Sequence, residues 1–280
     1  MAEDDSDLTD DEAPRRLRGP LGRARAGAAK RFKSLSFNRI FPNVVTVMAA
    51  CAGLTAIRYA INGQWDRAVI ALVAAAMLDG VDGRVARLLR GTSKFGAELD
   101  SLADAISFGV APAIIMYLWA MDASGGLGWA VCLLHAVCCV LRLARFNTMI
   151  GQPDVPAWAH NYFTGMPSPS GAGIAILPLI MWLQTGYDVF KQPFVAGAFL
   201  LASSLLMVSQ VPVYSGKHMR LKPNWVIPMM VAVGAFMAFL VTEPWATLSL
   251  MGLGLIATIP LSIMSFRRLK AAHPATESQP

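Results

Sequence analysis

The sequence predicts an all-α integral membrane protein, folded as a polytopic bundle of about eight transmembrane helices. Of its 280 residues, 55% are hydrophobic and only 15% are charged, and the mean hydropathy is +0.48. Soluble domains carry about 25% charged residues, so this composition is typical of a chain surrounded largely by lipid. The apolar residues also gather into stretches of about 20, the length that crosses a bilayer as a helix. These observations exclude a soluble enzyme and a coiled coil.

Eight apolar stretches account for most of the chain after residue 40. Residues that break helices separate them, such as Asn62-Gly63 after the first stretch and Glu243-Pro244 before the last. The fifth stretch contains Pro178, which a membrane helix tolerates when its neighbours satisfy the freed carbonyl group. The predicted spans are 43–61, 67–89, 102–121, 127–146, 169–184, 193–213, 224–241 and 245–264.

Basic residues are distributed unequally between the two sides of this predicted bundle. An even number of spans places both termini on one side, and 21 of the 24 Lys and Arg residues fall on that side. Positive residues favour the cytoplasmic side of a membrane. We therefore expect a multi-pass protein of the cytoplasmic (inner) membrane, with both termini in the cytoplasm.

Residues 1–39 are predicted to form a disordered cytoplasmic tail that leads into a juxtamembrane segment. The first twelve residues hold seven of the 18 acidic residues, and residues 15–39 then hold nine Lys and Arg among glycine and alanine. Such a composition cannot bury a core, but the basic part suits an anionic membrane surface. A nucleic-acid partner is not expected. Residues 266–280 are predicted to form a second cytoplasmic tail.

Four aspartates lie where the second predicted span ends and the third begins: Asp79, Asp82, Asp100 and Asp104. A carboxylate at membrane depth costs on the order of 2.5–3.5 kcal/mol, so four of them require a compensating partner. On helices, the first two are three residues apart and the last two are four apart, so each pair shares one helical face. The short connection makes the two helices antiparallel neighbours, and the carboxylates are expected to converge.

The type of ligand indicates the kind of cation. Oxygen ligands with no His or Cys nearby favour Mg²⁺ or Mn²⁺, and two such ions would neutralise four carboxylates. Mg²⁺ usually completes its coordination with phosphate oxygens of a substrate. Arg87 is well placed to bind a diphosphate, and the small residues Gly80 and Gly83 allow a bulky ligand to approach the backbone. The pattern therefore predicts a two-metal site for a phosphate-bearing substrate.

Two other interpretations of these charged residues are open. Aspartate and arginine side chains can form ion pairs at helix ends, and intramembrane acids can line a cation pathway in a transporter. A transporter would need acids along several spans, whereas these acids lie at one end of two spans.

The spacing of the motif is more specific than its composition, and it resembles the signature of the CDP-alcohol phosphatidyltransferase family. DDxxD-type prenyltransferases lack the central part of this pattern. The resemblance covers residues 40–213 and implies a six-helix catalytic core, often dimeric, with residues 214–265 as two additional helices. The matching residues are Asp79, Asp82, Gly83, Ala86, Arg87, Gly96, Asp100 and Asp104, eight positions within 26 residues.

The resemblance also implies roles for individual residues. The four aspartates would be metal ligands, and Asp104 would in addition be the base that faces the incoming alcohol. A neutral hydroxyl is a poor nucleophile, so a carboxylate within hydrogen-bond reach must take its proton. The residues that would contact CDP-diacylglycerol within the motif are Gly83, Arg87 and Ser93.

The start of the first span carries a second, shorter match. Residues 41–46 resemble the Pro-Asn-x2-Thr sequence of the family, which implies nucleotide contacts for Asn43 and Thr46. Proline at a helix start, with Asn and Thr nearby, is also ordinary capping chemistry, so a purely structural role is an alternative.

The acceptor alcohol is predicted from three further regions. Residues 142–147, 163–169, and 207–209 with 214–217 resemble the bacterial and archaeal subgroup of the family that uses L-serine. The expected reaction transfers the phosphatidyl group of CDP-diacylglycerol to the serine hydroxyl, giving phosphatidylserine and CMP. Glycerol 3-phosphate and inositol are the alternative acceptors.

An amino-acid acceptor requires a cation for its carboxylate. Arg142, Arg145 and Lys217 lie on the expected cytoplasmic side and are the candidates for serine binding. Anchoring of the helices by the positive-inside rule explains the same residues without a ligand.

Overall fold

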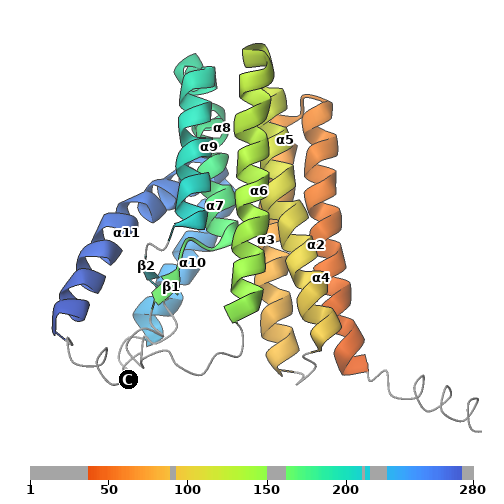
Figure 1. Cartoon of the computed structure of the whole chain (residues 1–280), viewed down its shortest axis with the longest axis vertical. Coiled ribbons are helices and arrows are strands. Elements are labelled where there is room, and N and C mark those ends of the chain that lie inside the picture. The colour runs from red at the N-terminus through yellow and green to blue at the C-terminus, as the bar shows by residue number, and fades with distance from the viewer. Residues whose placement is uncertain (1–36, 89–92, 150–161, 210–211, 215–225, 273–280) are drawn as a thin grey trace, which may run out of the picture.

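The protein is described by a computed structural model that covers residues 37–88, 93–149, 162–209, 212–214 and 226–272. Helices α2 to α9 run side by side along the long axis of the molecule, while α10 and α11 diverge from them (Figure 1). The start of α2 and the end of α11 lie at the same end of the bundle (Figure 1). Lys217 and most of the two predicted tails lie outside the described residues.

The first two helices form an antiparallel pair. Helix α2 covers Phe37–Ile61 and α3 covers Trp65–Leu88, and a tight turn at Gly63, with φ of 69°, joins them. They pack along their length through small buried residues, which let two backbones approach closely. These residues include Ala49, Ala56 and Ala60 of α2 and Ala68 and Ala75 of α3.

The third predicted span belongs to a longer, nearly continuous helical segment. Ser93 caps α4 (Lys94–Asp104) by accepting a hydrogen bond of 3.0 Å from the amide of Gly96. A π-helical turn, η1 (Ala105–Val110), follows directly after Asp104. The segment continues through α5 (Ala111–Met116), η2 (Tyr117–Met121) and η3 (Asp122–Ser124), and Gly125, with φ of 57°, reverses the chain into α6 (Gly125–Met149).

The fifth predicted span is divided into two helices. Helix α7 covers Ser168–Ala175 and α8 covers Leu177–Thr185, and the division falls at Ile176, two residues before Pro178. Proline has no amide hydrogen to continue the helical bonding, so the break is the expected local effect. A short turn, η5 (Asp188–Lys191), then leads into α9 (Pro193–Val208).

The predicted sixth span, 193–213, extends too far, because α9 ends at Val208. Residues Pro212–Tyr214 instead form strand β2, which pairs antiparallel with β1 (Tyr162–Thr164). The predicted span extends through Val211 and Val213, but Pro212 cannot donate the next helical hydrogen bond. Within the described residues, the fold is all-α apart from this small pair of strands.

Two C-terminal helices complete the described chain: α10 (Val226–Thr242) and α11 (Pro244–Ala272). Helix α11 packs against α8 at Gly252, where a Cβ atom would lie 2.6 Å from Cδ1 of Leu177. A larger residue here would require the side chain of Leu177 to move, so glycine at position 252 favours close packing of α11 against α8.

The protein is a multi-pass membrane protein. Three described segments are long and apolar enough to cross a membrane: Ile40–Ile61, Lys94–Thr148 and Pro244–Ser262. The second of these contains two of the predicted spans, and α9 and α10 are shorter apolar helices. Each predicted span overlaps at least one described helix, whereas the exact number of eight crossings remains a prediction.

Candidate active site

Three of the predicted aspartates form a compact cluster between α3 and α4. One carboxylate oxygen from each of Asp79, Asp82 and Asp100 lies within 4.8 Å of the others. Asp82 is buried and the other two are partly buried. Three like charges at this separation in a membrane helix pair repel one another strongly, which makes the cluster a natural site for a cation.

Asp104 lies one helical turn beyond Asp100 on α4 and is next to Asp79. Its carboxyl group lies within hydrogen-bond reach of the carboxyl group of Asp79. The guanidinium group of Arg142 interacts electrostatically with both carboxyl groups. The structure therefore brings the four predicted aspartates together, with Asp104 against Asp79 rather than within the group of three.

Helix α2 also supplies polar groups beside the cluster. The hydroxyl of Thr46 donates a hydrogen bond of 2.8 Å to Oδ2 of Asp82, and Thr46 is buried. Asn43 lies against α4, because a Cβ atom on Gly96 would be 2.9 Å from its side-chain oxygen. Helix α2 begins at Phe37, so Asn43 lies inside the helix, and the alternative that Pro42 and Asn43 cap its start is wrong.

Gly80 and Gly83 of α3 border open space. A Cβ atom on Gly80 or Gly83 would meet no other atom within 4 Å, so packing within the described chain does not require glycine there. Ser93 is used structurally as the cap of α4. Arg87 lies in α3, but its side chain is outside the described part of the structure.

The regions predicted to determine the acceptor converge beside the aspartates. Arg142 of α6 donates a hydrogen bond of 2.6 Å from Nη1 to the hydroxyl of Ser168, the first residue of α7. Gly165, with φ of 86°, approaches the end of α9 closely enough that a Cβ atom would lie 2.8 Å from the carbonyl of Ser209. Arg145 reaches the carbonyl of Val208 at 3.5 Å, a weak contact.

Two polar contacts here were not predicted from the sequence. The amide of Asn147 on α6 donates to the hydroxyl of Ser101 on α4 at 2.9 Å, and Ser168 orients Arg142. Asn147 and Ser168 lie inside the segments 142–147 and 163–169, which the sequence analysis had linked to the acceptor. Membership of these segments was the only sequence feature that indicated the two residues. Which residue faces them across the bundle depends on tertiary structure.

Comparison with known proteins identifies the family. The family described as CDP-alcohol phosphatidyltransferase matches residues 39–213, more than half of the chain. This protein belongs to the CDP-alcohol phosphatidyltransferase family. A second family description, CDP-alcohol phosphatidyltransferase 2, matches residues 224–260, which include α10 and part of α11.

Several curated relatives cover most of the chain. A CDP-diacylglycerol–serine O-phosphatidyltransferase of Mycobacterium tuberculosis is 39% identical over 236 residues, which are 84% of this chain and 82% of the relative. One of Helicobacter pylori is 35% identical over 218 residues, covering 78% and 88%. An archaetidylserine synthase of Methanothermobacter thermautotrophicus is 34% identical over 172 residues, covering 61% and 67%.

The site fits the metal dependence that is general in CDP-alcohol phosphatidyltransferases. The group of three described acids offers only carboxylate oxygens, the hard ligands that Mg²⁺ and Mn²⁺ prefer. Its spacing allows one ion to contact all three side chains, and the space beside Gly80 and Gly83 leaves room for a phosphate-bearing ligand. The cluster can therefore hold a divalent cation.

Proposed function

We propose that this protein transfers the phosphatidyl group of CDP-diacylglycerol to the hydroxyl of L-serine, giving phosphatidylserine and CMP. Relatives named for this reaction match 84% and 78% of the chain, and this observation carries the choice of acceptor. The convergence of the four aspartates with Arg142 supports the chemistry. The same chemistry with glycerol 3-phosphate or inositol is the competing assignment.

The reaction needs one bond to form and one to break at the phosphorus that bears diacylglycerol. The serine hydroxyl oxygen bonds to that phosphorus, the bond to the oxygen of CMP breaks, and CMP leaves. We assign the proton of the serine hydroxyl to the carboxylate of Asp104. Asp104 is suited to this role because it lies at the edge of the acid cluster, next to Arg142.

The other site residues bind and orient the nucleotide lipid in this proposal. Asp79, Asp82 and Asp100, with Asp104 beside them, would hold two Mg²⁺ or Mn²⁺ ions. Bound there, the cations would offset the negative charge that develops on the diphosphate as CMP leaves. The proposed contacts to CDP-diacylglycerol come from Asn43, Thr46, Gly83, Arg87 and Ser93.

Thr46 tests whether the orientation of Asp82 matters. Thr46→Val removes the hydroxyl that donates to Asp82 at 2.8 Å and keeps the shape of the side chain. Hydrogen bonds to metal ligands typically change metal affinity or activity by roughly 10–100-fold, so we expect the half-saturating Mg²⁺ concentration to rise by about tenfold. Thr46→Ser, which retains the hydroxyl, should remain close to the parent. Equal metal titrations for Thr46→Val and the parent would contradict the role of this contact.

Arg142 is the proposed cation for the serine carboxylate, with Arg145 and Lys217 as the other candidates. Of the two candidates that the structure describes, Arg142 is the one that interacts with both Asp79 and Asp104. Arg142→Met should raise the KM for serine by a factor of about 10–100, equivalent to roughly 1.5–3 kcal/mol for a lost charged hydrogen bond, with the KM for CDP-diacylglycerol nearly unchanged. Arg145→Met tests the second candidate and, if Arg142 binds the carboxylate, should leave the KM for serine close to that of the parent. Loss of turnover that saturating serine does not restore would indicate a structural role for Arg142 instead.

A CMP-release assay with a panel of acceptors tests the acceptor assignment. Serine should support release, and serinol, which lacks the carboxylate, should be a poor acceptor. Release with glycerol 3-phosphate or inositol but not with serine would overturn the serine assignment and leave the family unchanged. A cation transporter, the alternative from another class, would release no CMP with any acceptor.

We also propose the cytoplasmic membrane as the location, with both termini in the cytoplasm. The excess of Lys and Arg on the side of the termini supports this orientation. In this arrangement the catalytic core is 40–213, the additional helices lie in 214–265, and the tails are 1–39 and 266–280. A homodimer, implied by the family resemblance, stays a prediction.

A further inference from the structure

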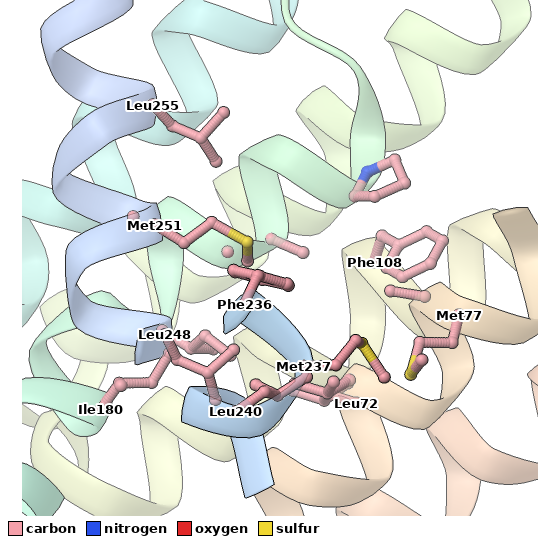
Figure 2. Close-up of a pocket in the computed structure, with 17 residues that line it drawn as sticks. Leu72, Met77, Phe108, Ile180, Phe236, Met237, Leu240, Leu248, Met251 and Leu255 are labelled. Carbon is pink, nitrogen blue, oxygen red and sulfur yellow. The ribbon is translucent and has the colours of Figure 1, made fainter. Parts of the chain in front are cut away.

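An apolar cavity of about 280 Å³ lies between the bundle and the two C-terminal helices. Figure 2 shows Leu248, Met251 and Leu255 of α11 on one wall and Phe108 and Met77 on the facing wall. Every lining residue is apolar or glycine, so the cavity offers no side chain that could bind a polar ligand. Its size is close to the lower end of the range of small-molecule sites, roughly 300–1,000 Å³.

The face of α3 that carries Asp79 also lines the cavity. Leu72 and Ala76 line the cavity, and Asp79 follows Ala76 by three residues. Residues three or four apart on a helix lie on the same face, one turn from each other. The face of α3 that carries Asp79 therefore passes into the cavity within one turn.

Two other elements also run from the polar residues of the site to the lining of the cavity. Phe108 lines the cavity four residues after Asp104, and Ala172 lines it four residues after Ser168, the partner of Arg142. On all three elements the lining residues lie farther than the polar residues from the end of the bundle where α3 meets α4. A ligand whose charged group occupies the acid cluster would therefore meet the cavity on the side toward the middle of the bundle.

We infer that this cavity holds one acyl chain of the lipid that carries the diphosphate, so that α10 and α11 form an acyl-binding wall for the catalytic core. The inference rests on the proposed function, because that function places a diacylglycerol next to the acid cluster. A hydrocarbon chain matches a lining without polar groups, and the lining residues Met77, Met237 and Met251 are flexible enough to adapt to it. The acyl chain would move from the hydrocarbon of the bilayer to the apolar side chains of the protein, which are similarly apolar. The cavity therefore positions the lipid and selects its chain length more than it increases binding affinity.

Gly173 allows the cavity to be filled without a clash at the backbone. It lines the cavity from α7, and a Cβ atom there would meet nothing within 4 Å. Gly173→Leu therefore places a side chain in the space assigned to the acyl chain. Gly234→Leu on α10 is the matched control, because Gly234 is exposed, has the same open surroundings and does not line the cavity.

Photo-crosslinking tests the inference without turnover. The full chain in nanodiscs is illuminated with CDP-diacylglycerol that carries a diazirine midway along one acyl chain, and the labelled peptides are identified. We expect labelling at residues 236–255, reduced at least fivefold in Gly173→Leu and unchanged in Gly234→Leu. Labelling that Gly173→Leu does not reduce would overturn the inference. Equal labelling of the same residues by a phosphatidylcholine with the same diazirine would also overturn it, because the cavity would then hold any membrane lipid.

Chain-length selectivity gives an independent measurement. Gly173→Leu should lower kcat/KM for dioleoyl CDP-diacylglycerol at least tenfold, while kcat/KM for a dihexanoyl substrate stays within about twofold. Phe236→Ala, which enlarges the cavity, should shift the ratio in the opposite direction. An equal loss for both substrates in Gly173→Leu together with an unchanged ratio in Phe236→Ala would overturn the inference. If serine proves not to be the acceptor, the crosslinking result still decides where the acyl chain lies.

Discussion

Replacing Asp104 by asparagine is expected to lower kcat for CMP release by a factor of about 10²–10⁴, the range that general base catalysis contributes. Asparagine keeps the size of the side chain but cannot accept the proton of the serine hydroxyl. Binding of CDP-diacylglycerol should change much less, because Asp104 lies outside the group of three acids formed by Asp79, Asp82 and Asp100. The measurement is kcat at saturating serine and metal, alongside equilibrium binding of CDP-diacylglycerol.

Glu98→Gln provides the control for this experiment. Glu98 is an exposed acid on the same helix, α4, and losing its charge should leave kcat near that of the parent. Near-normal turnover in Asp104→Asn would exclude Asp104 as the base. A loss of turnover accompanied by an equal loss of lipid binding would assign Asp104 to substrate binding instead.

The second large effect is expected from Asp82, the buried member of the acid cluster. Asp82→Asn removes one negative charge and one strong ligand from a site where Thr46 already orients the carboxylate. We expect the half-saturating concentration of Mg²⁺ or Mn²⁺ to rise at least tenfold and turnover at limiting metal to fall accordingly, since ligand loss lowers metal affinity. Asp79→Asn should act in the same direction.

Metal titrations followed both by activity and by calorimetry provide the readout for these variants. Asp66→Asn, in the first turn of the same helix, is the matched control and should leave the titration unchanged. If Asp79→Asn and Asp82→Asn both titrated like the parent, the proposed metal site would be wrong.

The convergence of the acids was predictable because it depends on local spacing. Asp79 with Asp82, and Asp100 with Asp104, share helical faces by their intervals alone, and the connection between the two helices is short. In the structure, α2 packs against both helices. The glycine position likewise predicted the turn at Gly63, whereas the sequence predicted one continuous fifth span and the structure divides it near Pro178. These features need no knowledge of distant parts of the chain.

Other parts of the site depend on tertiary contacts that periodicity does not encode. Thr46 and Asp82 are 36 residues apart, and only the family resemblance connected α2 to the acids. The bonds from Arg142 to Ser168 and from Asn147 to Ser101 join helices whose relative rotation the sequence pattern leaves open. The strand pair β1–β2 was missed because Val211 and Val213 were assigned to the end of a membrane helix, and strand pairing requires a partner about 50 residues away.

The most direct test of the account is the stoichiometry of a single reaction. The purified full chain in nanodiscs is given CDP-diacylglycerol, radiolabelled L-serine and Mg²⁺ or Mn²⁺, and both CMP and labelled lipid are quantified. We predict one CMP released for each serine incorporated into lipid, with neither product formed in the presence of a metal chelator. Release of CMP without incorporation of serine, or with glycerol 3-phosphate as the only productive acceptor, would contradict the proposed function.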